Sequence, residues 1–202
     1  RAEGERKVAD KAVNEAYDGL GETWTLFSAA FGRNSVDGRG LALLATVHYG
    51  AGYDNAFWDG SQMVFGDGDG VIFNRFTASL DVIGHELTHG VTRFTSNLIY
   101  LNESGALNEA FSDMMGTGVE YFFQPAGSGS MQADYLCGED IATGTPAFPL
   151  NGIRSLQNPS LFGDPDHYSV RYTGAQDNGG VHINSGIANH AFYLAIEGGA
   201  HR

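Results

Sequence analysis

Residues 80–94 read LDVIGHELTHGVTRF, and this stretch decides most of what the sequence predicts about fold and function. Its apolar residues recur at helical spacing, so we expect a helix with one apolar face. His85 and His89 are four residues apart and share a face of that helix, where both imidazoles reach one metal ion. Glu86 projects beside the metal, where it can take a proton from bound water. The H-E-x-x-H pattern therefore predicts a catalytic zinc site; the alternative is two helix-surface histidines and a solvated glutamate.

A second helix, expected over residues 106–123, offers a candidate for the third ligand that catalytic zinc takes from the protein. Glu109 stands near the start of this helix, 20 residues after His89. Asp113 lies four residues farther along the same face and can accept a hydrogen bond from the far nitrogen of a ligand histidine. Taken alone, Glu109 is better explained as an ordinary first-turn glutamate favoured by the helix dipole.

The N-terminal part of the chain mixes helix and strand patterns. Residues 5–18 have helical apolar spacing, and this helix is expected to continue toward Gly32. Residues 41–49 form an apolar run that is typical of a strand. Residues 56–73 predict a β-hairpin with MVF and VIF as its arms and the Asp-Gly-Asp-Gly of residues 67–70 as its turn.

The C-terminal part is mainly helical. Residues 125–180 are rich in loops and hold all five prolines, and a third helix is expected over residues 183–199. The predicted fold class is α+β with two lobes. Residues 1–80 form a lobe of helix and β-hairpin, and residues 81–202 form a helical, zinc-binding lobe.

Composition and charge exclude several classes of protein. The 202 residues carry 11 Lys and Arg against 24 Asp and Glu, a net charge of −13, which argues against nucleic acid as a partner. No apolar run approaches the ~20 residues that span a bilayer, so no membrane partner is expected either. The single cysteine, Cys137, excludes an internal disulfide, and we expect it to be a buried, inert thiol.

Three blocks in order, HELTHGVT (85–92), NESGALNEAFSD (102–113) and DNGGVHINSG (177–186), closely resemble the thermolysin-like metallopeptidases. The stretches YDNAFWDGSQMVFGDGDG (53–70) and GDPDHYSVRYTG (163–174) match the same family. The resemblance covers nearly the whole chain from about residue 10, and the short N-terminus is similar to that of protealysin-like members. It implies a two-lobed thermolysin-like fold and zinc-dependent cleavage of polypeptides on the amino side of bulky hydrophobic residues.

The resemblance also assigns the metal centre. It implies that His85, His89 and Glu109 bind one zinc ion. Glu86 would be the general base that activates the zinc-bound water and later passes the proton to the leaving amine.

Further residues support this centre by the same resemblance. Asp113 would orient His85, and Asn108 would support His89. His182 and Tyr100 match donors to the oxyanion of the tetrahedral intermediate, and Asp177 would hold the His182 ring and favour its charged form.

Substrate contacts follow from the resemblance as well. Asn55 and Ala56 match edge-strand positions that bind the peptide main chain, which is β-augmentation. Arg154 matches an arginine that grips a substrate carbonyl. The pocket for the residue after the scissile bond would be lined by the apolar side chains of Phe73, Phe76, Val82, Ile141 and Ile153.

One structural calcium ion is expected from the resemblance, because hard cations bind clustered oxygen atoms. Four acidic residues match ligand positions of the family, and Leu136 stands where some members carry a further glutamate but could offer its carbonyl. The acidic residues are Asp81, Glu120, Asp134 and Glu139.

The catalytic unit of the family continues for several helices, whereas this sequence stops three residues after Gly199. We therefore expect an incomplete C-terminal lobe, cleaved after Arg202, with the remainder bound as a second chain. Two alternatives stay open: an inactive metal-binding fragment with structural zinc, and an acidic, calcium-dependent binding module. A secreted, bacterial-type location is expected, or a cytoplasmic one if the chain is protealysin-like.

Overall fold

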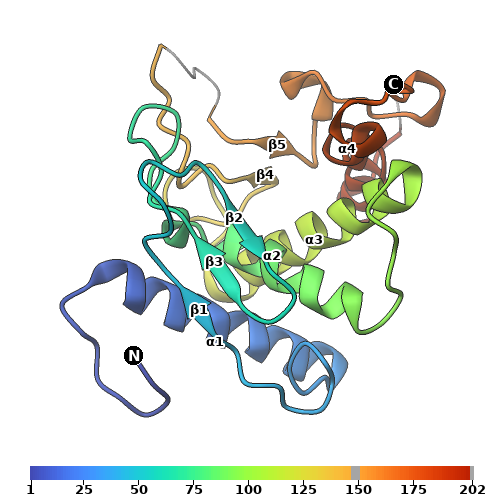
Figure 1. The fold of residues 1–202 in the computed structure, drawn as a ribbon. Coiled ribbons are helices and arrows are strands. Elements are labelled where there is room, and N and C mark those ends of the chain that lie inside the picture. Colours follow the sequence, from blue (N-terminus) through green and yellow to red (C-terminus); the bar gives the residue numbers. More distant parts are fainter. Residues whose placement is uncertain (147–150, 201–202) are drawn as a thin grey trace.

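Two helices at the centre of the molecule, α2 (Leu80–Arg93) and α3 (Asn102–Phe123), pack against each other (Figure 1). Both were predicted from apolar periodicity, although α3 begins four residues earlier than expected. Gly84 and Gly116 meet where the helices approach, and a Cβ on Gly116 would lie 2.4 Å from the Asp81 carbonyl oxygen. The absence of side chains there brings the two helices close enough for their polar residues to meet.

The computed structural model describes residues 1–146 and 151–200. Pro149, from the predicted loop, and Arg202, where cleavage was predicted, lie outside the described residues. Within the described ranges, no helix combines the length and the apolar character needed to cross a bilayer.

Helix α1 (Lys11–Phe31) packs against α2 on the N-terminal side of the molecule (Figure 1). The side chain of Asp10 caps the helix by accepting a hydrogen bond from an N–H of the first turn. The predicted start at residue 5 is therefore wrong by six residues. The continuation through Gly19 is confirmed, and this glycine makes room for α2, because a Cβ there would lie 2.5 Å from Ile83 Cδ1.

A small sheet covers the outer side of α2. Its strand order is β1 (Ala45–Thr46), β3 (Met63–Phe65) and β2 (Ala56–Trp58), with β1 parallel and β2 antiparallel to β3. The strand predicted over residues 41–49 is thus only two residues long. The hairpin is present, but its turn is formed by residues 59–62 and VIF is not one of its arms.

Asp59 accounts for the position of that turn. Its Oδ1 accepts hydrogen bonds from the backbone N–H groups of Ser61 and Gln62 and from the Ser61 hydroxyl. These donors, the Ser61 hydroxyl first, lower the pKa of Asp59 to about 2. The predicted turn at residues 67–70 is instead a loop beyond β3.

Strand β2 is the outer strand, and alternate main-chain groups point to its free edge. The Gly66 N–H binds the Asn55 carbonyl and the Asp59 N–H binds the Gln62 carbonyl, so the odd-numbered residues bond to the partner strand. The N–H and C=O groups of Ala56 and Trp58 therefore face away from β3.

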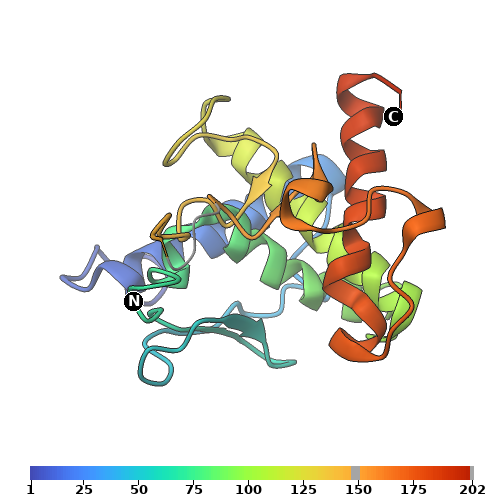
Figure 2. The ribbon, with the colours of Figure 1, turned by 90° about the horizontal axis from the view of Figure 1, so that it is seen from above.

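The C-terminal part places a fourth helix, α4 (Gln176–Glu197), across α3 at a steep angle (Figure 2). Residues 177–180 at its start have left-handed backbone angles, so the regular helix begins at Val181, two residues before the predicted start. Between α3 and α4 run mostly loops, as predicted. The short elements of the chain are β4 (Leu136–Cys137), β5 (Arg154–Ser155) and the 3-10 turns Phe76–Ala78, Pro159–Phe162 and Tyr168–Val170.

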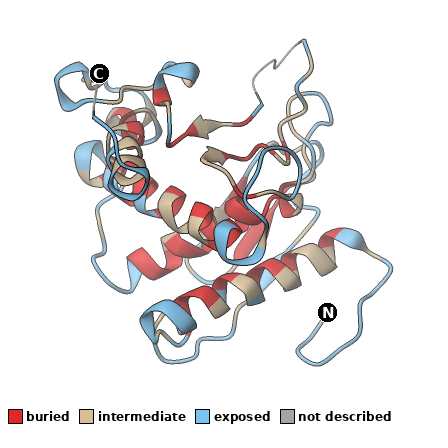
Figure 3. Ribbon diagram, turned by 180° about the vertical axis from the view of Figure 1, so that it is seen from behind, coloured by how far each residue is buried: buried red, intermediate tan, exposed pale blue. Residues whose placement is uncertain are grey.

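The apolar core lies between α1, α2 and the sheet, and the buried faces of the helices turn toward one another (Figure 3). Phe65 and Met63 of β3 and Leu87 of α2 are among its largest fully buried side chains. The fold is α+β, as the sequence predicted.

Candidate active site

Three potential metal ligands converge between α2 and α3. His85 Nε2 and His89 Nε2 are 3.1 Å apart. The two carboxylate oxygens of Glu109 lie 3.4 Å from His85 Nε2 and 3.3 Å from His89 Nε2. Glu109 is fully buried, and both histidines are largely buried. The two helices thus bring together the two histidines of the motif and Glu109, the candidate third ligand.

The outer nitrogen of each histidine is held by α3. His85 Nδ1 lies 2.8 Å from Asp113 Oδ1, and His89 Nδ1 lies 2.9 Å from Asn108 Oδ1, whose amide group donates to the Leu98 carbonyl. Because both partners are acceptors, each Nδ1 carries a proton, and in the neutral ring Nε2 presents a lone pair. A cation between these two lone pairs and the carboxylate removes their mutual repulsion, so the residues fit a zinc ion.

The electrostatics of the group favour positive charge at the same place. Burial lowers the pKa of His85, but hydrogen bonds to Asp113 and Glu109 outweigh it and raise the pKa to about 10. Burial opposes ionisation of Glu109, yet His85 and His89 hold its pKa well below the usual value. The carboxylates therefore stabilise a positive charge next to Nε2, whether a proton or a metal ion carries it.

Asp113 connects His85 to the C-terminal part of the chain. Arg154 donates from Nε to Asp113 Oδ2 at 2.9 Å and from Nη2 to Oδ1 at 2.6 Å. Asn189 of α4 donates to Oδ2 at 2.8 Å. Burial raises the pKa of Asp113, but Arg154 and His85 outweigh it and lower the pKa overall. Asn189 was not predicted from the sequence; its only signal there is a poor helix former within a predicted helix.

His182 and Tyr100 approach Glu109 from two other segments. His182 Nε2 lies 3.4 Å from Glu109 Oε2 and 3.1 Å from the Tyr100 hydroxyl, which donates to Glu109. Asp177 accepts at 2.6 Å from His182 Nδ1 and at 2.8 Å from the His182 backbone N–H. Asp177 can reach His182 because residues 177–180 have left-handed backbone angles that turn the chain back on itself. One of these residues must be glycine for lack of space, since a Cβ on Gly180 would lie 2.6 Å from the Tyr172 ring.

Glu86 lies on α2 beside the three potential ligands and does not belong to their group. Its Oε1 is 4.0 Å from His85 Nε2. Burial raises the pKa of Glu86, and the neighbouring histidines oppose that rise. A carboxylate with a raised pKa can accept a proton and return it near neutral pH.

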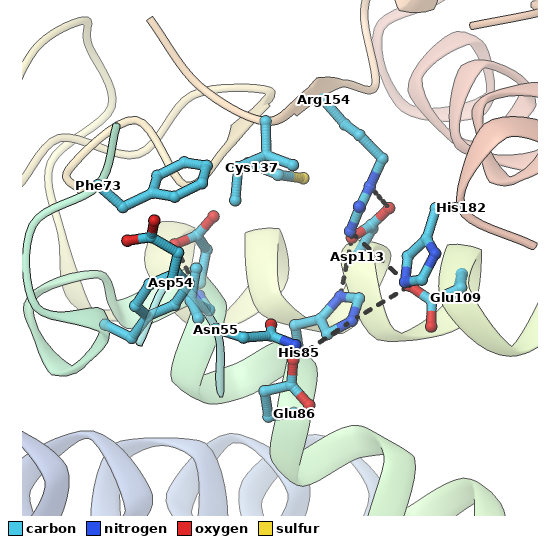
Figure 4. A pocket seen from close by; sticks show the side chains of 14 residues that line it. Asp54, Asn55, Phe73, His85, Glu86, Glu109, Asp113, Cys137, Arg154 and His182 are labelled. Carbon is cyan, nitrogen blue, oxygen red and sulfur yellow. Dashed lines mark hydrogen bonds and ion pairs between the residues drawn. The ribbon is translucent and has the colours of Figure 1, made fainter. Parts of the chain in front are cut away.

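Two pockets meet at this group and share Asn55, Glu86 and His182 on their walls. The first is shown in Figure 4; Arg154 points into it and Cys137 forms part of its wall. Cys137 is a free, buried thiol whose pKa burial raises well above the usual value. The predicted pocket residues that line it are Phe73, Phe76, Val82 and Ile153.

Ile141 does not line this pocket, which corrects the prediction. It is fully buried in the core cluster, and its carbonyl accepts a hydrogen bond from the Asn74 N–H. The second pocket lies along β2 and is lined by Ala56, Trp58 and Tyr100. Trp58 was not predicted, although its spacing of two from Ala56 puts both on the same edge of an extended strand.

Two family models match the chain. Residues 3–93 match "Thermolysin metallopeptidase, catalytic domain", and residues 96–202 match "Thermolysin metallopeptidase, alpha-helical domain". The chain belongs to the thermolysin metallopeptidase family. Bacillolysin from Bacillus cereus and thermolysin from Alicyclobacillus acidocaldarius subsp. acidocaldarius are each 52% identical to it, over 96% and 95% of this chain. This chain spans 34% of the length of either relative.

A solved structure also has a similar fold. It is the precursor of protealysin, a metalloproteinase from Serratia proteamaculans, with a TM-score of 0.87 and 47% identity. The match covers 98% of this chain and 63% of that one. The family membership predicted from three sequence blocks is therefore confirmed.

This thermolysin-family chain has a second acidic group, formed by Glu120, Glu139 and Asp140, whose carboxylate oxygens lie within 4.8 Å of one another. No described residue forms a hydrogen bond with the side-chain oxygens of Glu120 or Glu139. Burial, the larger cause, and the negative charge of the neighbouring Asp81 raise the pKa of Glu120 to about 11 and that of Glu139 to about 9. Buried carboxylates without a countercharge are the donor set for a hard cation.

Only part of the predicted calcium set belongs to this group. The carboxylate of Asp81 accepts from a serine hydroxyl and two backbone N–H groups instead. Asp134 accepts from the N–H of Leu136, which lies in β4. Asp140 was missed, and the signal for it was its position directly after Glu139.

Proposed function

We propose that this chain carries the active site of a zinc-dependent endopeptidase. The observation that supports it most is the convergence of His85, His89 and Glu109 while each outer Nδ1 is held by an acceptor. These three residues would hold one zinc ion. Zinc bound there would polarise the scissile carbonyl and lower the pKa of a water molecule.

Glu86 is the proposed general base. Its carboxylate takes a proton from the attacking water and delivers it to the nitrogen of the leaving amine. Its place beside His85 but outside the ligand set, and the pKa that burial raises, support both halves of this role.

His182 and Tyr100 are the proposed donors to the oxyanion. When His182 carries both ring protons, Asp177 holds Nδ1 and Nε2 donates toward the reacting carbonyl. The Tyr100 hydroxyl, 3.1 Å from His182 Nε2, would turn from Glu109 to the same oxygen. The two donors come from different segments and converge on one side of the ligand group.

Polypeptides are the proposed substrates. The outward-facing main-chain groups at the edge of β2 suit an extended peptide that adds to this edge. They are the C=O of Ala56 and the N–H and C=O of Trp58, whereas the Ala56 N–H donates to Asn55 Oδ1 at 2.9 Å. The apolar wall of the first pocket suits a bulky hydrophobic side chain after the scissile bond, and Arg154 at that wall would bind a substrate carbonyl. Asn55, on the walls of both pockets, would bind the main chain between them.

We also propose one structural calcium ion at Glu120, Glu139 and Asp140, with Asp81, Asp134 and Leu136 around it. Four carboxylate oxygens without hydrogen bonds support this site.

Secretion is proposed on the family resemblance alone. Fractionation of the producing cells would test it, and a purely cytoplasmic chain would contradict it.

The substitution Glu86→Gln tests the catalytic proposal. It keeps the size of the side chain and removes the base, so we expect one zinc ion per chain and a fall in kcat of about 10²–10⁴-fold. Zinc content and hydrolysis of a quenched peptide are measured on the same sample, with Glu22→Gln on α1 as the control. Undiminished turnover would show that Glu86 is not the base. A zinc-loaded wild-type chain without any turnover would favour the inactive-fragment alternative.

A further inference from the structure

We propose that Arg93 makes this cleft prefer an acidic side chain two or three residues before the scissile bond. The proposal rests on the proposed endopeptidase function, because it names the substrate class of the same cleft. Arg93 is the last residue of α2 and follows His89 by four residues, as His89 follows His85. The three side chains therefore share one helix face, and Arg93 lies about 6 Å farther along the axis than His89.

Arg93 lies on the wall of the second pocket, next to the turn after β2. Arg93 lines that pocket together with Trp58 and Ile99. A Cβ on Gly60, in the turn after β2, would lie 3.3 Å from Arg93 Nη1. The charged group thus rests against the turn at the end of the free edge that we propose for substrate.

No carboxylate of the described residues lies within ion-pair distance of Arg93, which is exposed. Asp59, next to Gly60, is held by the N–H and hydroxyl donors of its own turn. Glu86 and Glu109 line the same pocket, but Glu109 belongs to the group of three potential ligands and Glu86 is the proposed general base beside it. A substrate carboxylate is therefore the natural partner for this cation.

The direction of the strand decides which substrate residue meets Arg93. Strand β2 leads from Asn55, beside the ligand group, to the turn at Gly60. A peptide antiparallel to β2 enters at Gly60, so the residues before the scissile bond lie toward Arg93. Arg93 is the seventh residue after Glu86, which is a rise of about 10 Å along the helix and equals about three residues of extended chain.

Paired peptides that differ only by Glu or Gln at one position test this proposal. The position is moved through the four residues before and the two residues after the scissile bond, and kcat/KM is measured for each pair. We expect a Glu/Gln ratio of about 3–5 at the second or third position before the bond, decreasing at high salt. The ratio should fall to about 1 in Arg93→Gln, fall below 1 in Arg93→Glu and persist in Arg93→Lys.

Arg39→Gln is the matched control, because it removes one positive charge from a loop that lines neither pocket. It should keep the wild-type ratio. Cleavage of both peptides with equal efficiency, a ratio unchanged in Arg93→Gln, or a preference only after the bond would overturn the assignment while leaving the endopeptidase proposal intact.

A binding measurement separates the two proposals. The affinities of zinc-loaded Glu86→Gln for the Glu and Gln peptides are compared by fluorescence anisotropy, with and without Arg93→Gln. If the wild type cleaves no peptide, the endopeptidase proposal fails, and Arg93 is then judged on binding alone. A preference for the Glu peptide that disappears with Arg93→Gln supports it, and equal affinities overturn it.

Discussion

Each of the two histidines proposed as ligands uses its ring nitrogens differently: Nδ1 binds an acceptor on α3, and Nε2 faces the proposed metal position. The spacing of four residues predicted the Nε2 side, because such residues share a helix face. The acceptors were harder to predict. Asn108 was assigned only by resemblance, and Asn189 was missed because its contact with Asp113 joins residues 76 positions apart.

The contacts of His182 indicate its role at the scale of single residues. Its side chain is exposed and lies 3.4 Å from Glu109 Oε2, but it does not belong to the group of three potential ligands. We expect His182→Ala to keep its zinc and lose about 10²–10³-fold in kcat, because one donor to the oxyanion is removed. Peptide hydrolysis and zinc content are the measurements. Loss of zinc in this variant would instead make His182 a ligand.

At the scale of elements, apolar periodicity predicted the two central helices, because each presents one broad face to the core. The turn of the hairpin was predicted at the wrong place. The repeated Asp-Gly of residues 67–70 is a stronger local turn signal than the sequence of residues 59–62, where the turn lies. The side-chain bonds of Asp59 that fix the real turn are visible only in three dimensions. The same holds for the left-handed residues that precede α4.

The close approach of α2 and α3 leads to a prediction about stability. A Cβ at Gly116 would lie 2.4 Å from the Asp81 carbonyl oxygen, so Gly116→Ala should force the helices apart and lower the free energy of unfolding by about 1–3 kcal/mol. Gly118→Ala is the control, since its Cβ would meet only ordinary contacts, 3.5 Å or more away, and alanine favours the helix. Denaturant unfolding measures both. Equal stability of the two variants would contradict this account of the interface.

At the scale of the whole molecule, the proposed active site is assembled from segments that span His85 to His182. Glu120 of the acidic group lies on the same helix as Glu109, so α3 contributes a residue to each of the two proposed metal sites. The H-E-x-x-H motif predicted the first site, and the resemblance to the thermolysin family predicted part of the second; composition alone indicated only an acidic chain.

Calcium removal tests the second site. A ligand that binds only the folded chain, at a free concentration 100 times its Kd, raises the free energy of unfolding by about 2.7 kcal/mol. Saturating calcium should therefore raise Tm by about 5–10 °C. Thermal unfolding is followed with calcium, with magnesium and with a calcium chelator. In Glu120→Gln the calcium effect should largely disappear. A wild-type Tm that does not respond to calcium would contradict the proposed site.

The most direct measurement is hydrolysis of an internally quenched peptide with a bulky apolar residue after the scissile bond, before and after zinc is removed. The account predicts cleavage on the amino side of that residue, its loss in the zinc-stripped protein and its recovery when one equivalent of zinc is returned. Cleavage that persists without zinc, or a zinc-loaded chain that cleaves no peptide, would contradict it.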